Sequence, residues 1–195
     1  MIIERFDFLY KVIGLDLDNT LTEIDTTLDI ISRELSIKNI DVNDVIDYNL
    51  FTSFGLVNHE KENSFWLENE REIIENSIFS KDRYESIINN FSNSDTVFHI
   101  ITNRHNKYRD CTSDWLLRNN IKYDKLVMTG GESKINYIKE LKIELMIDDA
   151  PKVIEEIYQK GLDKIIDVVK VKYKYNERLT SKYIMDLKGN LLTNN

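Results

Sequence analysis

The stretch Tyr10-Lys-Val-Ile-Gly-Leu-Asp-Leu-Asp-Asn-Thr-Leu-Thr22 decides the fold of this chain. Its first half is an almost continuous apolar run, which is typical of a parallel strand buried on both faces. The run leads into Asp16 and Asp18, so we expect two carboxylates where the sheet meets solvent. Taken alone, this pair is equally typical of aspartates that cap a turn, and the rest of the chain has to decide between these interpretations.

Similar apolar runs recur four times and alternate with segments of helical spacing. The runs cover residues 96–101, 125–128, 144–147 and 164–169, and the helical patterns cover 108–119, 134–141 and 151–160. Strand–helix units with such short connections imply right-handed crossovers and a parallel sheet with helices on both faces. The sequence therefore predicts an α/β fold whose ligands bind beyond the carboxyl ends of the strands.

The segment 23–91 interrupts this alternation. It contains no convincing strand, and its apolar residues have helical spacing, as in Leu28, Ile31 and Leu35. We therefore predict a core formed by residues 1–22 and 92–195, with a helical cap of residues 23–91 inserted after the first strand. Residues 187–195 are expected to form a frayed polar tail.

Composition limits the classes of partner. The chain has 195 residues, of which 34 are acidic and 26 basic, and a formal charge of −8. This balance argues against nucleic acid, which is bound by clustered Lys and Arg. No apolar run approaches the roughly 20 residues that span a bilayer, and the single Cys111 excludes a disulfide scaffold and a Cys-rich zinc site. We expect a cytoplasmic protein without signal peptide or membrane anchor that acts on a small molecule, with its oligomeric state open.

A second pair of carboxylates follows another predicted strand. Asp148 and Asp149 end the run before Pro151, which brings them to the same edge of the sheet as Asp16 and Asp18. Carboxylates gathered in this way repel one another unless something positive lies between them. Mg²⁺ binds oxygen ligands, commonly one or two carboxylates together with a substrate phosphate. The sequence therefore predicts a magnesium site at this edge.

Two further groups reach the same edge. Thr102 ends the second predicted strand, and Lys134 begins a helix. Each alone is weak evidence, because such residues are usually structural or simply solvated. Beside a cation, however, a hydroxyl and an ammonium match what the equatorial oxygens of a transferring phosphoryl group require.

In chain order, these residues resemble the four motifs of the haloacid dehalogenase-like superfamily. The motifs stand here as Asp16-Leu-Asp-Asn-Thr20, Thr102, Lys134 and Asp148-Asp149, and the resemblance covers residues 10 to about 166. It implies a Rossmann-like core, with the cap where this chain has its insertion. An acid at position 18 distinguishes the chain from metal-independent dehalogenases and from P-type ATPases, which favours phosphoryl transfer to water.

The resemblance also implies a role for each residue. Asp16 would be the nucleophile that forms an aspartyl phosphate, and also a metal ligand. Asp18 would be the acid/base, with its backbone carbonyl on Mg²⁺. Asp148 would complete the metal site with support from Asp149. Thr102 and Lys134 would hold the phosphoryl group of a phosphate monoester.

Within the superfamily, several stretches resemble the 5′(3′)-deoxyribonucleotidase family and its bacterial relatives. They are Ile100-Ile-Thr-Asn-Arg-His105, Thr129-Gly-Gly131, Asp148-Asp-Ala-Pro151 and Tyr175-Asn176. This resemblance implies a phosphomonoesterase acting on (deoxy)nucleoside monophosphates, with no preference assigned between 5′ and 3′ esters. Asn103 and Arg104 are candidate substrate contacts.

The cap supplies four aromatic candidates. Flat rings stack on nucleobases, so Phe51, Phe54, Phe65 and Trp66 either line a base pocket or form the core of the cap. Both interpretations stay open at this point.

Three other functions remain as alternatives. One is a phosphatase of another metabolite, such as a sugar phosphate. Another is a phospho-acceptor receiver module, but such modules keep their acidic pair near the first strand, whereas here it comes late. The last is a non-catalytic binding protein, which is disfavoured because every catalytic position is filled.

Overall fold

The computed structural model describes residues 9–38, 40–56 and 58–192. Its centre is a sheet of seven strands in the order β3-β2-β1-β4-β5-β6-β7. The strands are β1 Val12–Leu15, β2 Val97–Thr102, β3 Lys125–Met128, β4 Leu145–Asp148, β5 Asp167–Val171, β6 Tyr183–Met185 and β7 Leu191–Leu192. All neighbours pair in parallel except β6 and β7, which are antiparallel. The predicted α/β fold with a parallel sheet is confirmed.

Helices cover both faces of the sheet. Successive residues of each buried strand point to opposite faces, so they pack against different helices. Leu145 and Ile147 pack in one cluster with α4 (Lys81–Phe91) and α5 (Arg109–Arg118). Met146, between them, packs in a second cluster with α6 (Ile135–Glu140) and α7 (Pro151–Gln159). Short 3-10 helices occur at Val42–Asp44, Asn106–Tyr108, Leu162–Lys164 and Lys174–Asn176.

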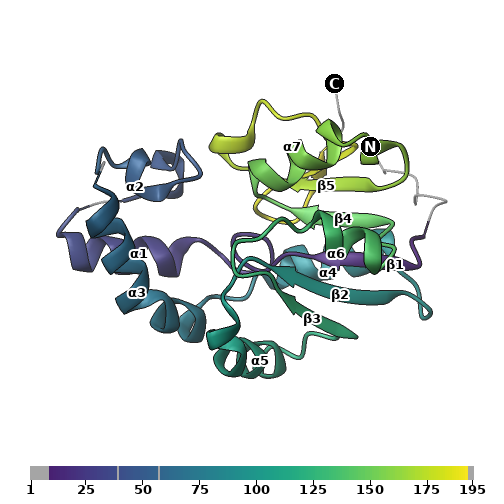
Figure 1. Cartoon of the computed structure of the whole chain (residues 1–195), viewed down its shortest axis with the longest axis horizontal. Coiled ribbons are helices and arrows are strands. Elements are labelled where there is room, and N and C mark those ends of the chain that lie inside the picture. The colour runs from purple at the N-terminus through teal and green to yellow at the C-terminus, as the bar shows by residue number, and fades with distance from the viewer. Residues whose placement is uncertain (1–8, 39, 57, 193–195) are drawn as a thin grey trace.

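The inserted helices α1 (Asp25–Leu35), α2 (Leu50–Ser53) and α3 (His59–Asn76) group at one side of the molecule (Figure 1). The chain leaves the core and returns to it side by side, since Thr22 forms an antiparallel bridge with Phe79. Helix α4 follows this return and packs on the sheet, where the ring of Phe91 lies 5.3 Å from that of Tyr183.

Two parts of the structure differ from the sequence predictions. Strand β5 begins at Asp167 instead of residue 164, because Leu162–Lys164 form a 3-10 turn after Gly161. The predicted polar tail is wrong for its described part, because Leu191–Leu192 pair with β6 across a turn at Gly189 (φ 82°) and Leu191 packs against the core. Residues 193–195 lie outside the described residues.

No helix in the described ranges has both the length and the apolar character needed to cross a membrane.

The loop after β1 is held in a tight shape. The carbonyl of Leu17 accepts hydrogen bonds from the amides of Thr20, Leu21 and Thr22. The fully buried guanidinium of Arg83, on α4, donates to the carbonyls of Thr20 at 2.8 Å and Thr22 at 2.7 Å. The sheet and α4 therefore fix the loop that presents Asp16 and Asp18.

Candidate active site

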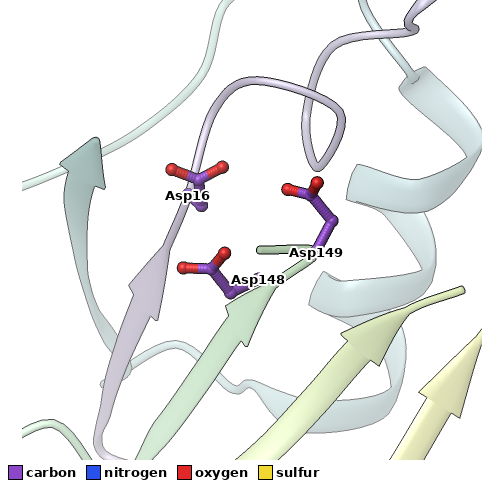
Figure 2. Close-up of side chains that lie close together, drawn as sticks. All are labelled: Asp16, Asp148 and Asp149. Carbon is purple, nitrogen blue, oxygen red and sulfur yellow. The ribbon is translucent and has the colours of Figure 1, made fainter. Parts of the chain in front are cut away.

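The ends of β1 and β4 bring three carboxylates together. Asp16 follows β1, and its amide extends the parallel pairing by donating to the carbonyl of Ile147 at 3.0 Å. Asp148 ends β4 and Asp149 follows it. One oxygen from each of the three carboxylates lies within 4.8 Å of the others, and all three residues are buried. Figure 2 shows the three side chains gathered beyond the tips of the two strands.

Lys134, the residue before α6, is the counter-charge within this cluster. Its Nζ donates to Oδ1 of Asp16 at 2.5 Å and to Oδ2 of Asp148 at 2.9 Å, and only 1% of the residue is exposed. Burial lowers the pKa of Lys134, but the attraction of Asp148 and Asp16 outweighs it, so the pKa is raised. The ammonium therefore stays charged and offsets part of the repulsion between carboxylates.

Asp149 is held by the loops after β1 and β5. Its two oxygens accept hydrogen bonds from Thr20 Oγ1, at 3.2 Å, and from the hydroxyl of Tyr175, while Asn176 Nδ2 donates to its backbone carbonyl at 2.8 Å. Burial, followed by the charge of Asp148, raises the pKa of Asp149 to about 7, against the effect of these hydrogen bonds. Burial also raises the pKa of Asp16, although Lys134 opposes it. Without metal, the site therefore tends to retain a proton.

Thr102 ends β2, the strand beside β1, and is completely buried. Its hydroxyl oxygen accepts a hydrogen bond from the amide of Arg104 at 3.3 Å. The next residue, Asn103, is exposed, and its Oδ1 accepts a hydrogen bond from the hydroxyl of Thr129 at 2.8 Å. The second predicted motif thus lies on the strand adjacent to that of Asp16.

Arg104 binds Asp18. The guanidinium donates from Nε to Oδ2 at 2.9 Å and from Nη2 to Oδ1 at 2.6 Å, and its Nη1 donates to Thr112 Oγ1 at 3.3 Å. Arg104 is buried, whereas 46% of the Asp18 side chain is exposed. The guanidinium of Arg104 therefore contacts the predicted acid/base, and its Nε and Nη2 donors are already hydrogen-bonded to that carboxylate.

A pocket of about 240 Å³ opens beside Asp18 and Arg104. Core residues form one wall and the insertion forms the other, and the lining residues are Asp18, Asn19, Thr27, Tyr48, Leu50, Trp66, Glu70, Ile73, Ile74, Asn103 and Arg104. The pocket therefore combines the predicted acid/base with a largely apolar surface.

Of the four aromatic candidates, only Trp66 lines this pocket. Phe51 and Phe65 are buried in the core with their ring centroids 5.3 Å apart, and Phe54 packs against the same cluster. The core interpretation therefore holds for Phe51, Phe54 and Phe65, and of the four candidates only Trp66 lies where it could meet a substrate.

Tyr48 and Glu70 also line the pocket, and sequence reasoning missed both. Tyr48 lies in a loop without periodicity, so no signal in the sequence marks it. Glu70 does have a sequence signal, because on α3 it lies four residues after Trp66 and four before Ile74. It therefore interrupts an apolar helix face, and a charge in such a position is unusual.

The acidic cluster fits a magnesium ion. Its donors are carboxylate oxygens from two adjacent strand ends, which are the ligands that Mg²⁺ prefers. The cluster already binds one cation, the ammonium of Lys134. Asp16, Asp148 and Asp149 are thus the residues that could hold the metal.

Comparison with known proteins gives consistent relatives. No family model matches the chain. Two curated proteins do: "Putative nucleotidase YqfW" of Bacillus subtilis is 28% identical over 140 residues, which are 70% of this chain and 69% of that protein. "Putative nucleotidase BH1399" of Halalkalibacterium halodurans is 24% identical over 139 residues, which are 71% of this chain and 69% of that protein.

Solved structures share the fold. A HAD-superfamily hydrolase of subfamily IA from Geobacter sulfurreducens superposes with a TM-score of 0.58 at 12% identity, covering 92% of this chain and 96% of that one. A "putative phosphoglycolate phosphatase" from Lactobacillus plantarum gives 0.62 at 11% identity, covering 91% and 95%. The "putative HAD-hydrolase YfnB" of Bacillus subtilis, solved with bound magnesium, gives 0.55 at 15% identity, covering 91% and 94%.

The two curated relatives confirm the resemblance to nucleotidases, and the solved structures confirm the fold of haloacid dehalogenase-like hydrolases. The curated relatives also support the prediction that the chain is an enzyme of the hydrolase class.

The raised pKa of Asp149 predicts a pH-dependent stability for the metal-free protein. In the unfolded chain this carboxyl titrates at its ordinary pKa of 3.8, whereas in the folded chain it titrates at about 7. Between these values the folded state binds more protons, so stability falls as pH rises through this window and levels off above it. Melting temperatures measured in EDTA from pH 4 to pH 8 should show this fall.

The Asp149→Asn variant is the matched test, because its amide oxygen can still accept hydrogen bonds but no longer ionises. We expect a clearly smaller fall across the same pH window. An equal fall in the variant and the wild type would show that Asp149 does not retain the proton.

Proposed function

We propose that this chain is a Mg²⁺-dependent phosphomonoesterase that forms an aspartyl phosphate on Asp16 and acts on nucleoside monophosphates. The observation that carries the proposal is the contact of one buried ammonium, Lys134 Nζ, with Asp16 at 2.5 Å and Asp148 at 2.9 Å, within a cluster of three carboxylates. Asp18, two residues after Asp16, lines a pocket that could hold a leaving group, which supports the proposal.

In the proposed reaction, Oδ2 of Asp16 attacks phosphorus while Lys134 holds Oδ1 and fixes the orientation of the carboxylate. The Oδ2–P bond forms as the bond from phosphorus to the leaving oxygen breaks, and Asp18, which enters this step as the protonated carboxyl, gives that oxygen its proton. Asp18 then takes a proton from the water that hydrolyses the aspartyl phosphate, so the enzyme returns to its starting state. Thr102 and Lys134 would bind the phosphoryl oxygens.

Asp16, the backbone carbonyl of Asp18 and Asp148, with Asp149 in support, would hold the magnesium ion. Bound Mg²⁺ would supply positive charge for the transferring phosphoryl group. Magnesium in the YfnB structure and the fit of the carboxylate cluster support this cofactor. The hydrogen bonds from Thr20 and Tyr175 would keep Asp149 oriented toward the site.

We further propose that Arg104 acts through Asp18 and does not contact the substrate. Its guanidinium fork is filled by that carboxylate, which it directs toward the pocket. A proton donor must lie within hydrogen-bond reach of the leaving oxygen, so a fixed orientation of Asp18 favours the transfer.

We propose that the insertion is a cap over the reaction centre, as the segment 23–91 was predicted to be. Its residues line the pocket opposite Asp18, which supports this role. Because α4 packs on the sheet, the cap in this proposal ends near Ser80, where the chain returns beside Leu21.

Cys111 is free and buried, which suits the reducing conditions of the cytoplasm, where we place the enzyme.

The names of the two curated relatives and the rings of Trp66 and Tyr48 beside the pocket support a nucleotide substrate. A panel of nucleoside and sugar monophosphates tests this choice. Higher kcat/KM for nucleoside monophosphates is expected, whereas a uniform preference for sugar phosphates would replace the nucleotidase assignment and keep the phosphatase.

Asp16→Asn should abolish Mg²⁺-dependent phosphate release with little loss of stability. The variant has no nucleophilic carboxylate, but Lys134 keeps its ion pair with Asp148. Phosphate release from an aryl phosphate and from nucleoside monophosphates, together with melting curves, measures both effects. Asp29→Asn, an exposed change of the same type on α1, serves as control and should retain full activity. More than trace activity in Asp16→Asn would remove Asp16 as the nucleophile.

Mg²⁺ should raise the melting temperature of the protein, because an ion bound only to the folded state stabilises it by mass action. Titration of Mg²⁺ against the melting temperature should give a saturable rise in the wild type and none in Asp148→Asn, which lacks one of the proposed ligands. The same response in both proteins would place the bound Mg²⁺ elsewhere.

A further inference from the structure

One carboxylate in the pocket has no role in the proposed reaction. Glu70 comes from α3 and lines the pocket together with Asp18, and it is half-buried. It belongs to the same helix face as Trp66, Ile73 and Ile74, at intervals of three or four residues. A carboxylate on such an apolar face is costly to fold unless it has a polar partner.

No residue that lines the pocket offers Glu70 a spare cation. Among the residues that line it, only Asp18, Glu70 and Arg104 are charged, and the Arg104 fork is occupied by Asp18. The hydroxyl of Tyr108 is in hydrogen-bond contact with Glu70. A single hydroxyl leaves other lone pairs of a carboxylate free, since its two oxygens accept about four hydrogen bonds.

The charges that act on Glu70 come from the core, at Asp18, Lys107 and His105. Burial and then the charge of Asp18 raise the pKa of Glu70, while Lys107, His105 and the Tyr108 hydrogen bond oppose this effect. Within the lining, Arg104 pairs with Asp18, so Glu70 has no partner cation among the lining residues, and Lys107 and His105 oppose its charge from outside the lining.

The rings of Trp66 and Tyr48 line the same pocket. Almost half of Tyr48 is exposed, and its ring lies edge-on to Tyr175 at 5.5 Å, so the neighbouring ring holds its orientation while leaving much of its surface open. A planar group placed here would meet aromatic surface and, near it, an acceptor on α3.

We propose that Glu70 determines specificity by accepting a hydrogen bond from an N–H or O–H group of an uncharged, ring-containing leaving group, and by repelling leaving groups that carry a carboxylate or a second phosphate. This inference rests on the proposed function and deepens it, because it names the chemical class that the pocket admits. A nucleoside has this chemistry, whereas phosphoglycolate, with its carboxylate, does not.

The test compares Glu70→Gln with Glu68→Gln. Both remove one charge from α3 without changing shape, but Glu68 is exposed and lies outside the pocket. Four substrates separate the chemistries: a nucleoside monophosphate offers a ring and donors, glycerol phosphate offers hydroxyls alone, phenyl phosphate offers a ring alone, and phosphoglycolate offers a carboxylate. Each kcat/KM is expressed relative to that of phenyl phosphate.

In Glu70→Gln the relative kcat/KM should fall about tenfold for the nucleoside monophosphate, because hydrogen bonds to charged acceptors contribute more than those to neutral ones. It should rise severalfold for phosphoglycolate as the like charge is removed. A fall of the same size for glycerol phosphate, which has no ring, would overturn the proposal that the leaving group must contain one. Glu68→Gln should leave all ratios unchanged. Unchanged ratios in Glu70→Gln would overturn the proposal.

A binding measurement separates this inference from the phosphatase assignment. A free nucleoside should quench the fluorescence of Trp66, with Trp66→Phe identifying the signal against that of the buried Trp115. The nucleoside should bind more weakly to Glu70→Gln than to the wild type or Glu68→Gln. This result would support the role of Glu70 even if no phosphate were released, and equal affinity for the three proteins would contradict it.

Discussion

The structure depends on the placement of one positive charge among buried carboxylates. Asp16, Asp148 and Asp149 are almost completely removed from water, and Lys134 contacts two of them. Ionised carboxylates in such surroundings repel one another and lose hydration, which is tolerated only with a counter-charge or a bound proton. Lys134 supplies the counter-charge, and the raised pKa of Asp149 favours a bound proton on that carboxyl. The carboxylate oxygens of this cluster are also ligands that Mg²⁺ prefers.

The fold holds this cluster from several sides. Parallel pairing of β1 with β4 brings Asp16 next to Asp148, the loop after β5 holds Asp149 through Tyr175 and Asn176, and α4 holds the loop after β1 through Arg83. Such support restricts the side chains to one arrangement before a substrate arrives, which is the condition for electrostatic catalysis. The insertion contributes the opposite wall of the pocket, so residues from the core and from the insertion line it together.

The sequence predicted the sheet and the gathering of the acidic residues, because buried parallel strands leave continuous apolar runs and their carboxyl ends share one edge. It did not predict the short strands β6 and β7, in which few residues pair, and the segment that contains β7 was predicted to be a polar tail. The contact of Arg104 with Asp18 was also missed, since it joins the loops after two adjacent strands and depends on side-chain rotamers, not on sequence spacing. Tyr48 left no periodic signal, whereas Glu70, on the apolar face of α3, did.

The most direct test of the account is a search for phosphate covalently bound to Asp16. Asp18→Asn would be mixed with an aryl phosphate and Mg²⁺, because an activated leaving group still transfers its phosphoryl group while hydrolysis of the intermediate, deprived of its base, slows by roughly 10²- to 10⁴-fold. Acid quenching, proteolysis and mass spectrometry should find a phosphoryl group on the peptide that contains Asp16, and none in the Asp16→Asn, Asp18→Asn double variant. A phosphoryl group on another residue, or steady phosphate release with no covalent species, would contradict the account.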